Sequence, residues 1–220
     1  MSYTYRSDLK IIIIGNVATG KTSYVNKWTK NIFNEAYKPT IVSEFGFKIF
    51  EYNGSFYRIQ LWDLAGMDQN AMVTKIFAKD AQGCIILCDA TNKKTRDDTL
   101  KWKRSIDEVG KFFDGGKIPC LLVENKIDLL SDDEKLKDDP ELIDFAQKNE
   151  FINCFRTSAK EGININESMS FLIKDIIDKM EKMNQSGKNV FSTERQNVVL
   201  NQDIHTQSSN VKRKKDGTCC

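Results

Sequence analysis

Residues 15–22, GNVATGKT, constrain the fold of this chain more than any other stretch. They directly follow the apolar run 9–14, LKIIII, and precede a segment with helical spacing. The pattern is G-x-x-x-x-G-K-[ST], in which glycines let the backbone approach a polyphosphate and loop N–H groups face the anion. Chance would produce the four fixed residues in about one chain in a hundred of this length. The loop therefore predicts binding of nucleotide phosphates, and by itself it leaves the base open.

Two side chains of this loop have specific chemistry. Lys21 is expected to reach the β- and γ-phosphates, and the Thr22 hydroxyl to ligate Mg²⁺. The expected phosphate-binding residues of the loop and the start of its helix are Gly15, Asn16, Val17, Ala18, Thr19, Gly20, Lys21, Thr22 and Ser23.

Strand and helix patterns alternate along the rest of the chain. Short apolar runs predict buried parallel strands, and Asn53-Gly54 predicts a hairpin between two strands of alternating pattern. The expected strands are 9–14, 44–52, 55–64, 83–89, 118–124 and 152–157, and the expected helices are 21–30, 69–79, 95–113, 141–149 and 165–183. This order predicts an α/β doubly wound sheet of six strands, mostly parallel, with one antiparallel strand on the edge side and about five helices.

Composition divides the chain into unequal parts. Residues 1–8 are expected to be a short N-terminal extension, 9–183 one domain, and 184–220 a disordered tail rich in Asn, Gln, Ser and Lys. From residue 184 onward there are six basic and three acidic residues, so the tail has a charge of +3. Because the whole chain has a net charge of +2, residues 1–183 have a charge of −1. Because the positive charge is local and terminal, nucleic acid is not an expected partner.

Two further motifs follow buried strands. Asn125-Lys126-Ile127-Asp128 ends in a carboxylate that can accept from the ring N–H and the exocyclic amino group of guanine, a pair that adenine lacks. Ser158-Ala159-Lys160 follows the last strand, and the N–H of Ala159 could reach the guanine O6. Taken alone, the first motif is a weak signal that a turn with an Asx residue would also explain, and the second is explained better by an ordinary loop than by a site.

Across residues 9–183 the chain resembles the Ras superfamily of small GTPases. Five elements in the same order carry this resemblance: the phosphate loop, Thr40, residues 63–66 (DLAG), 125–128 (NKID) and 158–160 (SAK). Residues 60–66 (QLWDLAG), the absence of a CaaX box and the terminal cysteine pair resemble the Rab family. Residues 100–103 (LKWK) are similar to the Rab branch numbered thirty-two and thirty-eight.

This resemblance implies a P-loop G domain and a role for each matching residue. The guanine-binding residues would be Phe33, Asn125, Lys126, Asp128, Ser158, Ala159 and Lys160, and the Mg²⁺ ligands would be Thr22, Thr40 and Asp63. The Gly66 N–H would bond the γ-phosphate, and Lys21 and Thr40 would be the catalytic residues. Residues 33–44 and 65–79 would be the switch segments that meet an exchange factor, a GTPase-activating protein and effectors, with an escort of the GDI type.

The sequence departs from that family at the position of the water-orienting Gln, where it has Met67. A thioether has no hydrogen-bond donor and is a weak acceptor, so Met67 is expected to be non-catalytic. Val17 occupies a loop position that is Gly in many Ras relatives, although Rabs tolerate other residues there. The hypothesis is that intrinsic GTP hydrolysis is slow while nucleotide binding is intact.

The tail ends with Lys212-Arg213-Lys214-Lys215 and, four residues later, Cys219-Cys220. Similarity to Rabs implies prenylation of Cys219 and Cys220, with the basic run attracted to anionic lipid. The expected location is the cytoplasmic face of an intracellular membrane, with a cytosolic pool.

Three functions remain open at this level. The leading one is a Rab-like GTP/GDP switch that regulates vesicle traffic. Met67 favours a second, a GTP-bound scaffold on membranes that barely hydrolyses its nucleotide. The third is a P-loop kinase or ATPase, which the guanine-type motif at 125–128 disfavours.

Overall fold

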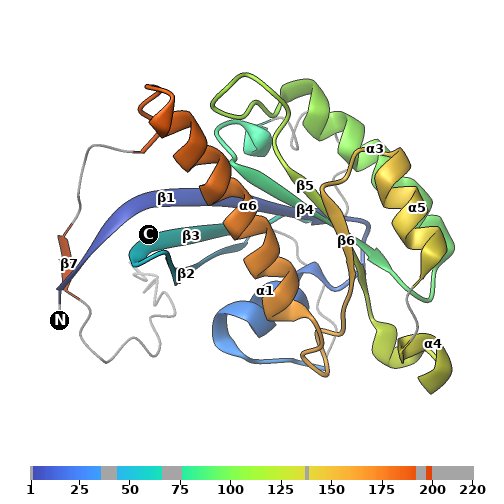
Figure 1. The fold of residues 1–220 in the computed structure, drawn as a ribbon. Helices are drawn as coiled ribbons and strands as arrows, with labels where there is room; N and C mark the ends of the chain where they lie inside the picture. Colours follow the sequence, from blue (N-terminus) through green and yellow to red (C-terminus); the bar gives the residue numbers. More distant parts are fainter. Residues whose placement is uncertain (1, 36–43, 66–75, 137–138, 192–196, 200–220) are drawn as a thin grey trace, which may run out of the picture.

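The computed structural model of the chain describes residues 2–35, 44–65, 76–136, 139–191 and 197–199. These residues form one β-sheet with helices on both of its faces (Figure 1). The strands are β1 Ser2–Gly15, β2 Glu44–Tyr52, β3 Ser55–Asp63, β4 Gly83–Asp89, β5 Cys120–Asn125, β6 Asn153–Arg156 and β7 Asn197–Val199. The helices are α1 Lys21–Lys30, α3 Lys93–Val109, α4 Asp132–Leu136, α5 Pro140–Lys148 and α6 Ile165–Gln185, with a 3₁₀ turn at Ile127–Leu129.

The six main strands lie in the order β2-β3-β1-β4-β5-β6. Pairing is parallel from β3 to β6 and antiparallel only between β2 and β3 within that order. Asn53 and Gly54 have positive φ angles of 48° and 69°, as the predicted tight hairpin turn requires. The predicted doubly wound α/β fold is therefore confirmed.

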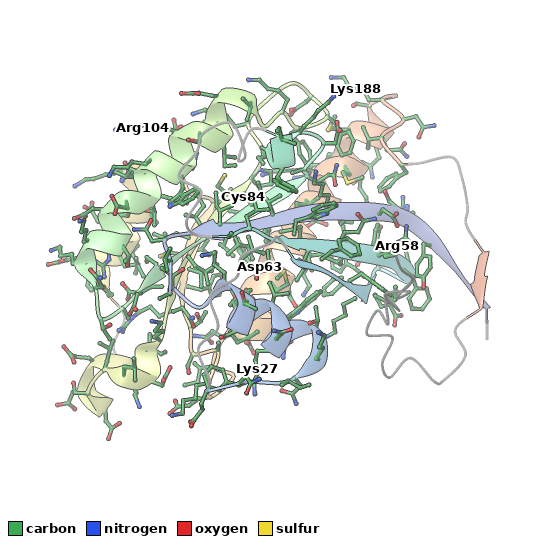
Figure 2. All side chains as sticks on the ribbon, turned by 180° about the vertical axis from the view of Figure 1, so that it is seen from behind. Lys27, Arg58, Asp63, Cys84, Arg104 and Lys188 are labelled. Atoms are coloured by element: carbon green, nitrogen blue, oxygen red, sulfur yellow. The ribbon has the colours of Figure 1, made fainter. Side chains whose placement is uncertain are left out.

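Helices α1 and α6 lie over the face of the sheet turned to the viewer in Figure 1, and α3 lies over the opposite face, which Figure 2 shows from behind. The apolar stripe of α6 is fully buried, and a Cβ on Gly83 of β4 would lie only 2.6 Å from the Cδ1 of Ile176. The small residue on β4 lets the long helix pack closely against the sheet. No helix in these described segments combines the length and the apolar character needed to cross a bilayer.

The N-terminal strand is longer than the sequence predicted. Residues 2–8, expected as an extension, continue β1, and the start of β1 pairs with β7 in antiparallel register from Ser2–Val199 to Thr4–Asn197. Thus three residues of the expected disordered tail add a seventh strand to the sheet. The apolar patch at 198–200 was the only sequence signal of this pairing.

The largest differences from the predicted helices are an early end to α3 and an additional short helix, α4. The helix expected over 95–113 is α3 and ends at Val109, where Gly110 adopts an extended conformation and Lys111 bridges to Lys117. The charged loop expected at 131–140 contains α4, whose start is capped because Glu134 accepts from the N–H and hydroxyl of Ser131. S-x-x-E is the sequence signature of a capping box, and the structure shows the half of it in which the Glu134 carboxylate accepts from the Ser131 N–H.

Candidate functional site

The chemically distinctive residues gather where the parallel strands end. Gly15, Asp63, Asp89 and Asn125 are the last residues of β1, β3, β4 and β5. In an open α/β sheet this carboxyl edge is where ligands bind. Figure 2 shows Asp63 between the sheet and α1.

The phosphate loop turns from β1 into α1 at two glycines. Gly15 has a φ of +142°, and a Cβ there would lie 2.2 Å from the carbonyl oxygen of Leu87. Gly20 has a φ of +90°, and a Cβ there would lie 2.3 Å from Nδ2 of Asn125. Only glycine fits either position, because the conformation is left-handed and the space is filled by a neighbour.

Lys21 lies inside this loop and is only 6% exposed. Its Nζ donates to the carbonyl oxygens of Gly15 and Asn16 at 3.0 and 2.9 Å. Burial lowers the pKa of Lys21 from 10.5 to about 8, and the charge of Asp63 offsets part of that effect. An anion bound in the loop would oppose the effect of burial further, because it favours the charged ammonium group.

Thr22 and Asp63 bring two oxygen groups together beside the loop. The Thr22 hydroxyl donates to Oδ2 of the fully buried Asp63 at 2.5 Å. A hydroxyl and a carboxylate are hard oxygen donors, and protein sites for Mg²⁺ commonly use one or two such groups together with substrate phosphates and water. The donor set therefore fits Mg²⁺ next to a bound polyphosphate.

Asn125 joins the phosphate loop to the loop after β6. Its Nδ2 donates to the carbonyl oxygen of Thr19 at 3.0 Å, and its Oδ1 accepts from the Thr157 hydroxyl and the Ala159 N–H, both at 3.1 Å. The side chain is buried. In this structure the N–H of Ala159, expected to reach a guanine oxygen, thus donates to Asn125.

Asp128 and Ser158 connect the two motifs at 125–128 and 158–160, which are called the base-side motifs below because the sequence predicts that they bind the base. The Ser158 hydroxyl donates to Oδ1 of Asp128 at 2.6 Å and accepts from the N–H of Glu161 at 2.9 Å. A carboxylate has two oxygens and about four acceptor positions, so Asp128 can accept from a ligand as well as from Ser158. The structure thus brings together residues that lie thirty positions apart in the sequence.

Lys126 adopts a left-handed conformation with a φ of 70° and pairs through Nζ with Oδ2 of Asp89 at 2.6 Å. Burial of Asp89 opposes its ionisation, but hydrogen bonds from Lys126 and Thr91 outweigh burial and lower the pKa of that carboxyl. Sequence reasoning missed Asp89, although its place at the end of a buried strand is the kind of position that signals a site.

Helix α3 contacts the phosphate loop through two polar side chains. The side chain of Asn16 donates to Oδ2 of Asp98 and accepts from Nε1 of Trp102, both at 2.9 Å. At the sequence level Trp102 belonged to the expected helix 95–113 and to the Rab-like run 100–103, and Asp98 was not singled out. A polar contact between residues so distant in sequence has no local pattern that could reveal it.

The remaining predicted site residues lie at the rim. Phe33 is half-buried and packs against the core, and Lys160 pairs with Glu35 at 3.3 Å between two largely exposed side chains. Val17 is 43% exposed, and Ser23 is half-buried on α1. Thr40, Gly66, Met67, Cys219 and Cys220, with most of the segments 33–44 and 65–79, lie outside the described residues.

Three aromatic side chains form a cluster next to the segments 33–44 and 65–79. They are Phe45, which directly follows the first segment, Trp62 of β3, and Phe77 near the end of the second segment. The rings of Phe45 and Trp62 meet edge to face with centroids 5.4 Å apart, and Trp62 and Phe77 are 5.7 Å apart. Phe45 is 54% exposed, and Nζ of Lys10 lies 5.0 Å from the Trp62 ring. At the sequence level Trp62 belonged to the expected strand 55–64 and to the Rab-like run 60–66, and Phe45 to the expected strand 44–52.

Comparison with known proteins gives a consistent result. Residues 10–178 match the model of the Ras family. The chain is 33% identical to Ras-related protein Rab-7L1 of Rattus norvegicus over 96% of both chains. It is 36% identical to Ras-related protein Rab-32A of Dictyostelium discoideum over 80% of this chain and 81% of that protein. It is 32% identical to Ras-related protein Rab-32 of Homo sapiens over 76% of this chain and 74% of that protein.

The low pKa of Lys21 predicts that binding of a nucleoside diphosphate consumes protons at alkaline pH. Below about pH 8 the empty site already holds the ammonium form, so affinity is flat with pH. Above pH 8 the empty site has lost that proton. Because the bound phosphate requires it, affinity for GDP falls by up to about tenfold per pH unit. Calorimetry from pH 7 to 9.5, in buffers of different ionisation enthalpy, measures the proton uptake directly.

Lys48 provides a matched control. Its pKa is also lowered by burial, and its Nζ donates to the carbonyl of Trp28, away from the loop. Lys48→Met should keep the pH profile of binding, whereas Lys21→Arg, whose charge persists throughout this range, should flatten it if it binds. Proton-neutral binding by the natural chain at pH 9 contradicts the assignment of Lys21.

Proposed function

The chain belongs to the Ras family, as a small GTPase of the Rab type in the branch numbered thirty-two and thirty-eight, and we propose that it is a GTP/GDP switch with slow intrinsic hydrolysis. A GTP-binding switch in membrane traffic is what relatives of this type imply.

One observation carries the proposal: the side chain of Asn125 fixes the phosphate loop and the two base-side loops to one another. A nucleotide needs its phosphates and its base held at a set separation. Because one buried amide contacts segments at Thr19, Thr157 and Ala159, that separation is built into the fold.

The phosphate end of the nucleotide would lie against the loop and α1. The Nζ of Lys21 would exchange its carbonyl partners for phosphate oxygens, and loop N–H groups would donate to the same anion. Thr22 and Asp63, with Thr40, would hold Mg²⁺, which when bound neutralises charge on the phosphates. Lys21 and Thr40 are the proposed catalytic residues, and Gly66 is proposed to donate to the γ-phosphate.

The base end would lie between the loops that follow β5 and β6. Asp128 would accept from the two N–H groups of guanine, while its Oδ1 keeps the hydrogen bond from Ser158. Adenine would leave the carboxylate without those donors, a cost that opposes its binding. Lys126, Phe33, Ala159 and Lys160 complete the proposed guanine-binding set.

Slow hydrolysis is proposed on two side chains. Met67 stands where relatives carry the Gln that orients the attacking water, and its thioether cannot donate a hydrogen bond. Val17 adds a branched, 43% exposed side chain on the phosphate loop, where glycine would leave space for that water or for an incoming group. Neither residue belongs to the proposed binding contacts of the base.

Partners would be recognised through the segments 33–44 and 65–79. Loss of the γ-phosphate is proposed to release both segments, which changes the surface offered to an exchange factor, a GTPase-activating protein and effectors. A GTPase-activating protein that supplies its own Gln and Arg could still act on this chain, so Met67 does not by itself imply a permanently active state.

The membrane anchor is proposed at Cys219 and Cys220, with attraction of residues 212–215 to anionic lipid. An escort of the GDI type would account for a cytosolic pool. Because β7 pairs with β1, the connection between the folded part and the two cysteines is residues 200–220 rather than the whole tail.

Guanine selectivity tests the proposed function and separates it from a kinase or ATPase. With Mg²⁺ present, unlabelled GDP should displace a fluorescent GDP analogue at least about a thousandfold more effectively than ADP, because adenine offers the half-buried Asp128 neither of the two N–H groups that guanine would donate. Asp128→Asn should reduce that preference, since an amide in place of the carboxylate loses one acceptor oxygen. Equal displacement by ADP and GDP contradicts the proposal.

Restoring the water-orienting residue tests the slow cycle. Met67→Gln should raise the single-turnover rate of GTP hydrolysis by at least about tenfold, because the amide can orient the attacking water. Met183→Gln, the same change at a half-buried position on the far end of α6, is the matched control and should leave the rate unchanged. Equal rates for the natural chain and Met67→Gln contradict a role for this position.

The lipid anchor is tested on full-length protein purified from eukaryotic cells. Intact mass should show two isoprenoid groups, and the double change of Cys219 and Cys220 to Ser should move the protein from membranes to the soluble fraction with GDP affinity retained. Cys154→Ser, at a half-buried thiol of β6, should keep membrane binding. Unmodified terminal thiols on the membrane-bound protein contradict the proposed anchor.

A further inference from the structure

A buried carboxylate lies directly before the base-side motif. Glu124 is the second-last residue of β5 and only 2% exposed. Its Oε1 accepts from Nη2 and Nε of Arg96 at 2.5 and 3.2 Å, and its Oε2 accepts from Nε of Arg156 at 3.2 Å. Both oxygens of one buried carboxylate are thus held by guanidinium groups from opposite sides.

The two arginines connect this carboxylate to the surrounding elements. Arg96, near the start of α3, also donates to Oδ2 of Asp139, whose Oδ1 caps α5 by accepting from the N–H of Leu142. Arg156, the last residue of β6, donates through Nη1 to the carbonyl oxygen of Glu134 in α4. We call Glu124, Arg96, Arg156 and Asp139 the charge network.

The charge network lies where the two base-side segments begin. Glu124 and Arg156 are register partners in the parallel pair β5–β6, and the carbonyl oxygen of Glu124 accepts from the N–H of Thr157 at 2.8 Å. The chain continues from Glu124 into 125–128 and from Arg156 into 157–160. The ion pairs therefore fix the relative position of the two segments at the point where they leave the sheet.

Stability alone does not explain such a network. Desolvation of a buried ion pair commonly cancels its attraction, so apolar residues of similar volume would stabilise the fold as well. What directional, charge-assisted hydrogen bonds from two guanidinium groups add is fixed geometry. The neighbouring segments are the ones that would hold Asp128, together with the Ser158 hydroxyl that donates to it, at a set distance from a base.

We infer that Glu124 is a positioning residue for guanine recognition, acting through Arg96 and Arg156 to set Asp128 and the segment 157–160 against the base. This inference rests on the proposed nucleotide function. It adds to that function a residue that does not touch the ligand, placed one strand position before the motif that reads it.

The test is Glu124→Gln, which keeps size and removes the charge. GDP affinity should fall at least about tenfold through faster GDP release. The preference for GDP over inosine diphosphate, which lacks the exocyclic amino group, should fall at least about threefold because Asp128 no longer meets that group squarely. The second readout is decisive, since a loss of stability alone leaves the ratio of two nearly identical ligands unchanged.

Asp107→Asn is the matched control. It breaks another ion pair on α3, in which Nζ of the buried Lys103 lies 2.7 Å from both oxygens of the half-buried Asp107. It should lower the melting temperature and leave the GDP-over-inosine-diphosphate ratio unchanged. Arg156→Gln, which keeps the pair of Glu124 with Arg96, should lower the ratio by less than Glu124→Gln and serves if the latter does not fold.

The outcomes distinguish failure of the proposed nucleotide function from failure of the positioning role of Glu124. If the natural chain shows no preference for GDP over ADP, the proposed function is wrong. If the natural chain prefers GDP, but folded Glu124→Gln or Arg156→Gln keeps the natural ratio of GDP to inosine diphosphate, the positioning role is overturned and the function stands. A ratio that falls equally in Asp107→Asn also overturns it.

Discussion

The hydrogen bonds of the Asn125 side chain are the constraint on which the rest of the site depends. A buried amide must satisfy both its donor and its acceptor, and here the partners come from Thr19 on one side and from Thr157 and Ala159 on the other. Because Gly20 leaves no room for a Cβ beside Nδ2, loop and amide fit in one arrangement. The distance between the phosphate and base ends of the site follows from this contact rather than from loops that move independently.

Electrostatics prepares the same site for an anion. Lys21 is buried at a cost that lowers its pKa to about 8, and the nearby Asp63 carboxylate compensates only in part. A bound phosphate would supply negative charge next to the Lys21 ammonium group. Part of the free energy of binding would then come from offsetting the cost of burying that charged group. The paired Lys126 and Asp89 differ, because their charges are already matched at 2.6 Å and serve to hold the loop.

The sequence predicted the parts of this molecule that are written in local patterns. The G-x-x-x-x-G-K-T loop, the Asn53-Gly54 turn and the apolar stripe of α6 each lie within a few residues, and the structure has them where predicted. Contacts between residues distant in the sequence had no such pattern. The hydrogen bonds of Asn16 with Asp98 and Trp102 form only when the chain has folded, and so does the pairing of β7 with β1. The start of α4 was different, since its capping box was readable and was overlooked.

Holding a nucleotide and cleaving it make different demands on a chain like this one. Holding rests on backbone geometry and on buried groups such as Lys21, Asn125 and Glu124, each fixed by several partners from different elements. Cleavage needs one water held by one side chain, so a single substitution there can slow the reaction and leave binding intact. On the roles proposed for Met67 in cleavage and for the charge network in holding the nucleotide, changes at the two should separate hydrolysis rate from guanine affinity.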